Sequence, residues 1–581
     1  MSDTVFSSKS EKLDFFSIFM FPFKYGLAGK KSAPNDAANR IISGNKNWKR
    51  LPFEKDEPSN YNEFYYFHRY VRKAIYDTAN EKSGHEVMAY LVRYDYKMLE
   101  LRYAVDVESD RNDKRVFRSE TISAKVTSIN LHLFDNQVAV LTIVTERNPS
   151  GGPVSFNDIL LYNDLARRIY PPYLGKKDGN WISGDGYVEK ILNNDSATAV
   201  PKLSSKIFPV EFMLTGEGCP SRDDFEKRDY KDEKEHLSSV IKDVLSPFSF
   251  EPDLDESRTK DSLFFTSFTD DRMFVVSYCS DDNISQAFCS KERIRDNYHL
   301  SKDWYKFIFV DGGSAGIANQ EMMEHLIMKH TYQRWVEYGT LYGMSRYSLV
   351  MVCDHADFSQ TVLKSHMKSM YYQMALIMLF QKAMLLKFAF DVDEISKKFL
   401  DKKHRELIDE GSKLQGDFIK FVNQYWFAEV TPQEQGIEMY NKWREIMSLD
   451  GLYENTSRAI SDMTEYIDNE VEKDSKRLLD TITRIGLPIA AATMLTDFLL
   501  LSKALDEVWV PLLNVSWVDL LSWVKQPWVH FFLVISVLLL CFSVVGMLFK
   551  MWLRRPFSWI ESKMQVFSKI RKMSPWLRPK S

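Results

Sequence analysis

Apolar side chains recur at helical spacing in the last third of the chain. Steps of three, four or seven residues separate them, which places them on one stripe of a helix. The stripe, with one threonine in it, is made of Leu452, Thr456, Ile460, Met463, Ile467, Val471, Leu478, Ile482 and Ile485. The pattern predicts one unbroken helix that continues to Leu501 and is about 75 Å long. A rod of this length needs partners, and we expect the same rod from other subunits.

Two apolar segments follow this stripe. Val529 to Phe549 contains no acid, lysine or arginine, and about twenty such residues cross the hydrocarbon core of a bilayer. Ile485 to Leu501 is shorter and rich in alanine, glycine and threonine, as expected for a helix that packs against copies of itself. The pattern predicts two transmembrane helices over residues 485–552, with an external loop at 503–528.

The distribution of charge predicts the orientation of these spans. The net charge of −4 hides a strongly basic tail over residues 553–581, where Glu561 is the single acid. Basic residues also precede the first span, while the loop is acidic. The positive-inside rule then places both termini in the cytoplasm of a bacterial inner-membrane protein. The five cysteines show no paired spacing, which fits a reducing compartment.

The first two thirds of the chain alternate between strand and helix patterns. Residues 1–85 are predicted to be an N-terminal arm and helix, in which Leu13 to Phe23 is a packing arm. Residues 86–355 read as an α+β ligand-sensing domain, with a strand at Tyr305–Val310 among others. Residues 356–484 are a predicted helical stalk. The predicted fold class is therefore an α+β cytoplasmic domain, long stalk helices and two C-terminal transmembrane helices.

This arrangement resembles the CorA family of divalent-cation channels. The likeness covers mainly Ser359 to Ser581 and lies in the order of the parts. The Gly-Met-Asn motif of the family is missing, because the chain after Leu501 reads SKALDEVWVPLLNVSW. Gly546-Met547 lies on the second span and is followed by Leu548. In the family the motif binds the hydrated cation, so its absence argues against ordinary magnesium uptake.

Two further runs resemble CorA-like proteins encoded beside type III CRISPR systems. They are FNDILLYNDLARRIYPP at Phe156–Pro172 and RWVEYGTLYGMSRYS at Arg334–Ser348. The resemblance implies that the protein is an antiviral effector. It also implies a pentameric channel that is opened by a nucleotide messenger such as S-adenosylmethionyl-AMP. It also implies that the ligand site lies in the soluble domain.

Small and polar residues on the first predicted span are candidates to line a pore. They are Gly486, Ala490, Thr493 and Asp497, and their spacing of four, three and four places them on one helical face. Rings of such residues, ending in carboxylates, attract cations. Close helix packing is the competing interpretation of the small residues.

Charged residues on the stalk and the tail have two interpretations each. In the CorA family, acidic residues between subunits hold divalent ions, and the stalk has Asp462, Glu465, Asp468, Glu470, Glu472 and Asp474. A solvated helix face explains the same run. The basic tail helix fits anionic membrane lipid, and packing against neighbouring stalks is the alternative.

The nucleotide hypothesis depends on two places. Arg167 and Arg168 are adjacent at the end of a predicted helix, and a forked guanidinium pairs well with phosphate. The second place is the loop 311–320, where glycines precede a helix N-terminus that favours an anion. The candidate residues in that loop are Gly312, Gly313, Ser314 and Asn319. Asn319 either reads a base or ribose edge or caps the helix.

Other functional classes have weaker support. Gly312 to Gly316 is a formal G-x-S-x-G, so a membrane-bound hydrolase would use Ser314 with His325, His330 or His355. The segment Tyr61–Tyr76 alternates aromatic and basic residues, but a packed helix face explains it better than nucleic-acid binding. No ATPase or zinc motif is present.

The prediction is therefore a non-enzymatic, homo-oligomeric membrane ion channel gated by a nucleotide messenger. No cofactor is assigned firmly; a nucleotide messenger and a divalent cation are the candidates, and nucleic acid is not expected as a partner. The alternative function is a constitutive divalent-cation transporter that is gated by its own ion.

Overall fold

The fold is described from a computed structural model of the 581-residue chain. The described residues are 2–27, 33–54, 57–76, 88–109, 115–169, 176–177, 180–181, 207–216, 221–224, 237–250, 262–268, 272–289, 297–313, 315–400, 404–504 and 535. Contacts divide the chain into two units, Met1–Val471 and Glu472–Ser581, and the first contains all of the β-structure described below.

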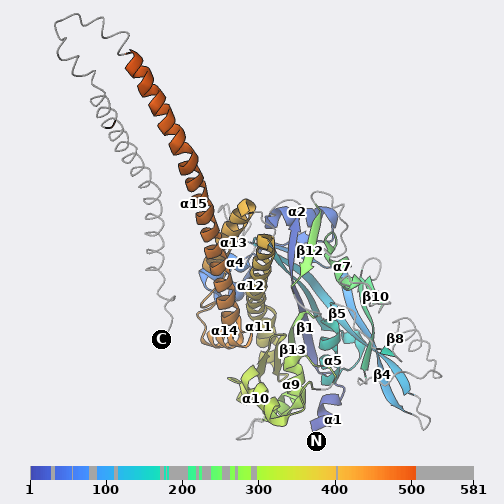
Figure 1. Ribbon diagram of the computed structural model, residues 1–581. Helices are drawn as coiled ribbons and strands as arrows, with labels where there is room; N and C mark the ends of the chain where they lie inside the picture. Colours follow the sequence, from blue (N-terminus) through green and yellow to red (C-terminus); the bar gives the residue numbers. More distant parts are fainter. Residues whose placement is uncertain are drawn as a thin grey trace, which may run out of the picture. The chain divides into compact units, whose positions relative to one another are not determined.

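One large mixed sheet forms the centre of the first unit (Figure 1). Its longest path has the strand order β10-β9-β4-β5-β6-β1-β13-β16-β15-β14, with β2, β3, β11 and β12 attached at its sides. Most neighbours are antiparallel, whereas β13 with β16 and β11 with β12 are parallel. The strands are β1 (Asp14–Leu27), β2 (Lys49–Arg50), β3 (Met88–Arg93), β4 (Tyr96–Ser109), β5 (Arg115–Phe134), β6 (Val138–Arg147), β9 (Ile207–Gly216), β10 (Ser221–Asp224), β11 (Ser249–Phe250), β12 (Leu263–Ser267), β13 (Phe274–Ser280), β14 (Thr331–Tyr332), β15 (Leu341–Met344) and β16 (Ser348–Cys353); a separate pair is β7 (Lys176–Lys177) with β8 (Asn180–Trp181).

The N-terminal segment is a central strand of this sheet. β1 pairs with β6 on one side and with β13 and β12 on the other. Its apolar residues alternate strictly between the two faces, and phenylalanines on both faces are fully buried. The prediction of a packing arm at Leu13–Phe23 was therefore wrong. A strand that is covered on both faces has apolar residues at successive positions, so its sequence lacks the alternation of polar and apolar residues that marks a half-exposed strand.

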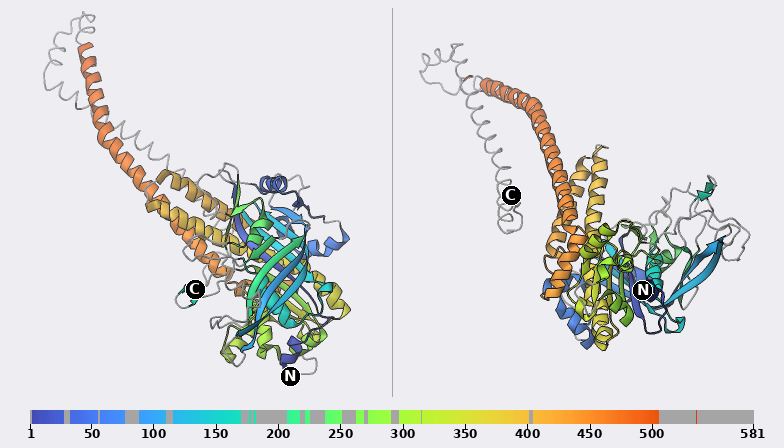
Figure 2. Two further views of the ribbon diagram at one scale, coloured as in Figure 1. Left: turned by 90° about the vertical axis from the view of Figure 1, so that its right-hand side faces the viewer. Right: turned by 90° about the horizontal axis from the view of Figure 1, so that it is seen from below.

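Helices cover both faces of the sheet (Figures 1 and 2). The described helices are α1 (Ser2–Ser7), α2 (Pro34–Gly44), α3 (Pro58–Tyr66), α4 (Arg69–Ile75), α5 (Phe156–Ala166), α7 (Ser239–Leu245), α8 (Asp282–Phe288), α9 (Lys302–Phe309), α10 (Gln320–His330), α11 (Lys364–Lys368), α12 (Met370–Leu400), α13 (His404–Gln424), α14 (Glu434–Ile446) and α15 (Leu449–Ala504). One core contains residues of α5, α7, α8 and α9, and the other contains residues of α3, α4 and α12 to α15.

The strand predicted at Tyr305–Val310 is wrong. Tyr305–Val310 belongs to helix α9 and its C-cap, where Ser301 accepts a hydrogen bond from the amide of Trp304. Trp304, Phe307 and Ile308 are buried on one side of α9. A short apolar run cannot be assigned to a strand or a buried helix from its periodicity alone.

The long helix predicted from the apolar stripe is confirmed. α15 is one helix of 56 residues, with Pro488 inside it. In the first unit its stripe is buried at Ile460, Met463 and Ile467. Gly411 of α13 allows close approach here, because an added Cβ would lie 2.3 Å from Cδ1 of Ile467.

The predicted fold class, which ended in two transmembrane helices of CorA type, is wrong. Across the described ranges, no helix combines the length and the apolar character that a membrane crossing requires. Residues 485–501 of α15 include three alanines, two threonines and Asp497, which lower the hydropathy of this segment. The predicted inner-membrane location and membrane-protein class are overturned by the same finding. All of the predicted second span except residue 535, nearly all of the loop 503–528 and the tail 553–581 lie outside the described residues.

Candidate functional site

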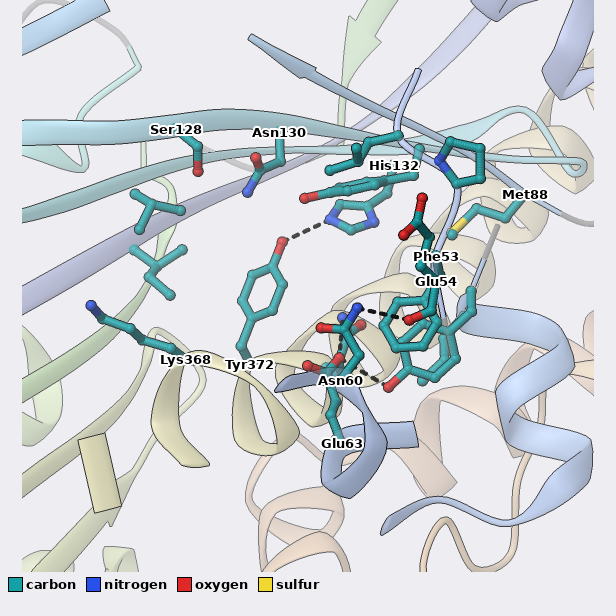
Figure 3. Close-up of a pocket in the computed structure, with 18 of the residues that line it drawn as sticks. Phe53, Glu54, Asn60, Glu63, Met88, Ser128, Asn130, His132, Lys368 and Tyr372 are labelled. Atoms are coloured by element: carbon teal, nitrogen blue, oxygen red, sulfur yellow. Dashed lines mark hydrogen bonds between the residues drawn. The ribbon is translucent and has the colours of Figure 1, made fainter. Parts of the chain in front are cut away.

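A pocket of about 500 Å³ lies between the sheet and the helices of the second core (Figure 3). This volume is within the range of small-molecule sites. Its walls come from β3, β5 and β6, from α3, from the start of α12, and from the segment 51–54. We call it the β5–α12 pocket.

A row of polar side chains on β5 forms the roof of this pocket. Ser128, Asn130 and His132 point toward the helices, whereas Ile129 and Leu131 point into the opposite core. A register shift in the pairing of β5 with β6 precedes this row. In sequence, such alternation is typical of a strand with one solvated face. Here the polar face is instead covered by α12.

His132 is buried and holds a short hydrogen-bond chain. Its Nε2 atom lies 2.7 Å from the hydroxyl of Tyr372, which in turn lies 3.1 Å from Oγ1 of Thr142. Burial lowers the pKa of His132 from 6.5 to about 3. Burial also raises the pKa of Tyr372. Both groups are therefore neutral at physiological pH.

Three buried side chains of the pocket wall carry polar atoms without a hydrogen-bond partner. These atoms are Oδ1 of Asn130, Nδ1 of His132 and Oε1 of Gln373. The three residues are only 6%, 2% and 9% exposed, respectively. Each unpaired buried polar group costs about 1–3 kcal/mol. The two amide oxygens are suited to a ligand that donates hydrogen bonds, whereas the role of Nδ1 depends on the tautomer of His132.

One end of the pocket is acidic and aromatic. Oε1 of Glu63 accepts hydrogen bonds from Tyr76 (2.9 Å) and from Nε2 of Gln373 (3.1 Å). Burial raises the pKa of Glu63, and these two bonds oppose the rise. Glu54 lines the same end beside Phe53, whose ring centroid is 4.0 Å from that of Tyr76 (Figure 3).

The opposite end holds the lysine of the pocket. Lys368 forms an ion pair with Glu146, and its Nζ atom lies 5.1 Å from the centroid of Phe16. Figure 3 shows Lys368 on the far side of Tyr372 from Glu54. Because Lys368 already has a carboxylate partner, it does not neutralise the acidic end.

The structure brings together the two places of the nucleotide hypothesis. Nη2 of Arg167 donates to the carbonyl of Val310 at 2.7 Å, directly before the loop 311–320. An added Cβ at Gly312 would lie 2.9 Å from Cβ of Asp164, which is on helix α5 just before the two arginines. The sequence had suggested these places separately, and their contact is a finding of the tertiary structure.

The arginines at this contact have structural partners. Arg167 is 2% exposed, and it lies 3.4 Å from Oδ1 of Asp164 while holding the C-terminal carbonyl of α9. Burial lowers its pKa, and Asp164 opposes that effect. Arg168 lies 3.6 Å from the same carboxyl group. Nε and Nη1 of Arg167 have no hydrogen-bond partner, so a ligand role for this pair stays a prediction.

The other predicted ligand residues of the loop 311–320 differ in what the structure shows for them. Oδ1 of Asn319 accepts from the amide of Met322 at 2.8 Å, so it caps α10 as the simpler interpretation stated. Gly313 has no atom within 4 Å of an added Cβ. Ser314 lies outside the described residues.

The predicted pore residues all lie on α15. Gly486 is half-buried, and Ala490, Thr493 and Asp497 are exposed. Oγ1 of Thr493 donates back to the carbonyls of Ile489 and Ala490. Among the described side chains, no group of three or more His, Cys, Asp or Glu residues is arranged to hold a metal ion.

Comparison of the chain with protein-family models, with curated proteins and with solved structures gives no match.

Proposed function

We propose that the first unit is a receptor for a small organic ligand, which binds in the β5–α12 pocket. The observation that carries this proposal is the set of unpartnered polar atoms on Asn130, His132 and Gln373. A folded protein retains such atoms when a bound molecule or water pairs with them. The volume of the pocket admits a molecule the size of a nucleoside.

The chemistry of the wall narrows the class of ligand. The amide oxygens of Asn130 and Gln373 accept hydrogen bonds and do not donate them, so the ligand has to bring N–H or O–H groups. Tyr76, Tyr90 and Phe53 offer flat apolar surfaces. An adenosine-type messenger supplies an amino group and a flat base, and it is therefore the first candidate.

A receptor role also fits the contacts of the pocket wall formed by α3 and α4. The amide of His68 donates to the carbonyl of Val430, and Nε2 of His68 lies 2.9 Å from Glu429. This segment leads into α14 and from there into α15. A ligand that displaces α3 would thus act on the start of the long helix, provided that it prefers one arrangement over the other. Opening of a membrane channel forms no part of this proposal.

The proposal is tested by thermal shift and calorimetry with adenosine and its analogues on the full-length protein. Ser128→Trp fills the pocket from β5, and Lys125→Trp places the same side chain at an exposed site of that strand. Binding should raise the Tm of the wild type and of Lys125→Trp, and Ser128→Trp should lose the shift. An unchanged shift in Ser128→Trp would place the ligand elsewhere.

A further inference from the structure

We infer that the ligand of the β5–α12 pocket carries a positively charged amine, which binds at the end formed by Glu54, Glu57 and Glu63. This inference rests on the proposed function and adds the charge of the ligand to it. It depends on the balance of charge in the pocket, on the free oxygen of Glu63 and on the aromatic rings beside it.

The charges of the pocket wall do not balance. Four carboxyl groups and one lysine line it, and Lys368 pairs with Glu146. Three carboxyl groups, those of Glu54, Glu57 and Glu63, remain without a cation among the described residues. His132 does not supply one, because its burial keeps it neutral. The lining of this end of the pocket therefore has an excess of carboxyl groups over cations.

Glu63 is placed to bind such a cation. Both of its neighbours donate to the same atom, Oε1, and no described residue donates to Oε2. Burial penalises its charged form, as its raised pKa reflects. An ammonium group next to Oε2 would supply the missing partner and would offset that penalty, since charge-assisted hydrogen bonds are about twice as strong as neutral ones.

The aromatic rings at this end support the same assignment. Phe53 and Tyr76 line the wall, and Phe53 also stacks on Phe64 with a centroid separation of 5.7 Å. Ring faces attract ammonium groups more strongly when both are removed from water. The unpartnered buried acceptors on Asn130 and Gln373 support a ligand in this pocket independently of the acidic residues.

A phosphate group does not fit this end of the pocket. Its charge would meet Glu54, Glu57 and Glu63, and Lys368 is both distant from them and paired (Figure 3). Among adenosine-type ligands, those with an ammonium group on the ribose side should bind better than nucleotides. The order of affinity should therefore be cation, neutral molecule and anion.

Two matched series of probes test this order at pH 7 by calorimetry. The first is 5′-amino-5′-deoxyadenosine, adenosine and AMP, which share a body and differ in charge. The second is tryptamine and its neutral alcohol analogue, tryptophol. In whichever series shows binding, we expect the cation to bind at least about tenfold more tightly than the neutral compound. Equal affinities within such a series would overturn the inference and leave the receptor role intact.

Substitutions assign the preference to the acidic end. Glu63→Gln should lower the ratio of the affinities for the cationic and the neutral probe by about tenfold. The affinity for the neutral probe should stay the same, since glutamine still accepts a hydrogen bond from Tyr76. Glu57→Gln, at an exposed position, should weaken the preference without a risk to folding. Glu321→Gln, exposed on α10, is the matched control. A preference that survives both pocket variants would contradict the assignment, and no binding by any probe would instead refute the receptor role.

Discussion

Single side chains on a buried sheet face set the chemistry of the pocket. Asn130 and His132 lie on β5 where the opposite face has Ile129 and Leu131. A buried polar residue destabilises the folded state unless it has a hydrogen-bond partner. A purely structural role therefore does not explain Asn130 and His132 at these positions. Their hydrogen bonds and their neutral state follow from burial under α12, and so does their capacity to receive a ligand.

The burial of His132 predicts a measurable loss of stability in acid. The folded state does not bind a proton on His132 until about pH 3, whereas the unfolded chain does so near pH 6.5. The unfolded state thus binds more protons in this interval, and the free energy of unfolding falls as the pH falls through it. From pH 7 to pH 4 the contribution is about 3 kcal/mol.

His132→Phe keeps a ring of similar shape and cannot titrate. Urea unfolding at several pH values should show that this variant loses about 3 kcal/mol less than the wild type between pH 7 and pH 4. At pH 7 the variant should itself be weaker by about 1 kcal/mol, because the hydrogen bond to Tyr372 is lost. Parallel pH profiles for the two proteins would mean that His132 titrates normally in the folded state.

At the scale of the elements, helices α13 and α15 depend on a close approach at one glycine. Gly411 faces Ile467, with room for a hydrogen atom only, while Gly416 on the same helix has no neighbour within 4 Å of an added Cβ. Both positions are glycines on the same helix. Substitutions at them therefore distinguish the effect of packing from the effect of helix propensity on stability.

Gly411→Val should reduce the free energy of unfolding by about 1–3 kcal/mol, because the added methyl groups force α13 away from α15. Gly416→Ala should increase it by up to about 1 kcal/mol, since alanine favours the helix more than glycine does. Chemical denaturation of both variants measures the two effects. If Gly411→Val proves as stable as the wild type, the contact between the two helices is not tight.

At the scale of the whole molecule, the apolar stripe of α15 changes its role along the helix. Ile460, Met463 and Ile467 are buried by the first unit. From Leu478 to Ile489 the stripe is instead exposed, with Ile482 63% and Ile485 58% accessible. Exposed apolar residues at steps of three and four are typical of a helix that associates with other helices.

Self-association through this stripe is the expected result. Size-exclusion chromatography with light scattering should give a mass above that of the monomer for the wild type, and Ile482→Glu should lower it. Leu487 is 46% exposed but lies on the opposite side of the helix, so Leu487→Glu is the matched control and should keep the wild-type mass. A monomeric wild type would refute this expectation.

Much of the element order could be predicted from the sequence, but the pocket could not. The periodicity of residues 452–485 predicted α15, and the strand patterns within residues 86–355 include the segment that forms β5. The polar face of β5 looked solvent-exposed, because nothing local shows that α12, more than 200 residues later, covers it. The contact of Arg167 with Val310 also could not be predicted from the sequence, since it joins two separate parts of the chain.

The sequence by itself determined the periodic elements, because helix and strand spacing follow from local backbone geometry. It also supplied the acids, amides and aromatic rings of the pocket. Only the tertiary structure decided which apolar run is a central strand, as with β1. The predicted transmembrane helices were wrong for the described residues, where no helix has the length and apolar character needed to cross a membrane. The tertiary structure also decided that Glu63, His132 and Gln373 share one cavity, because burial and charge balance depend on contacts between residues far apart in the chain.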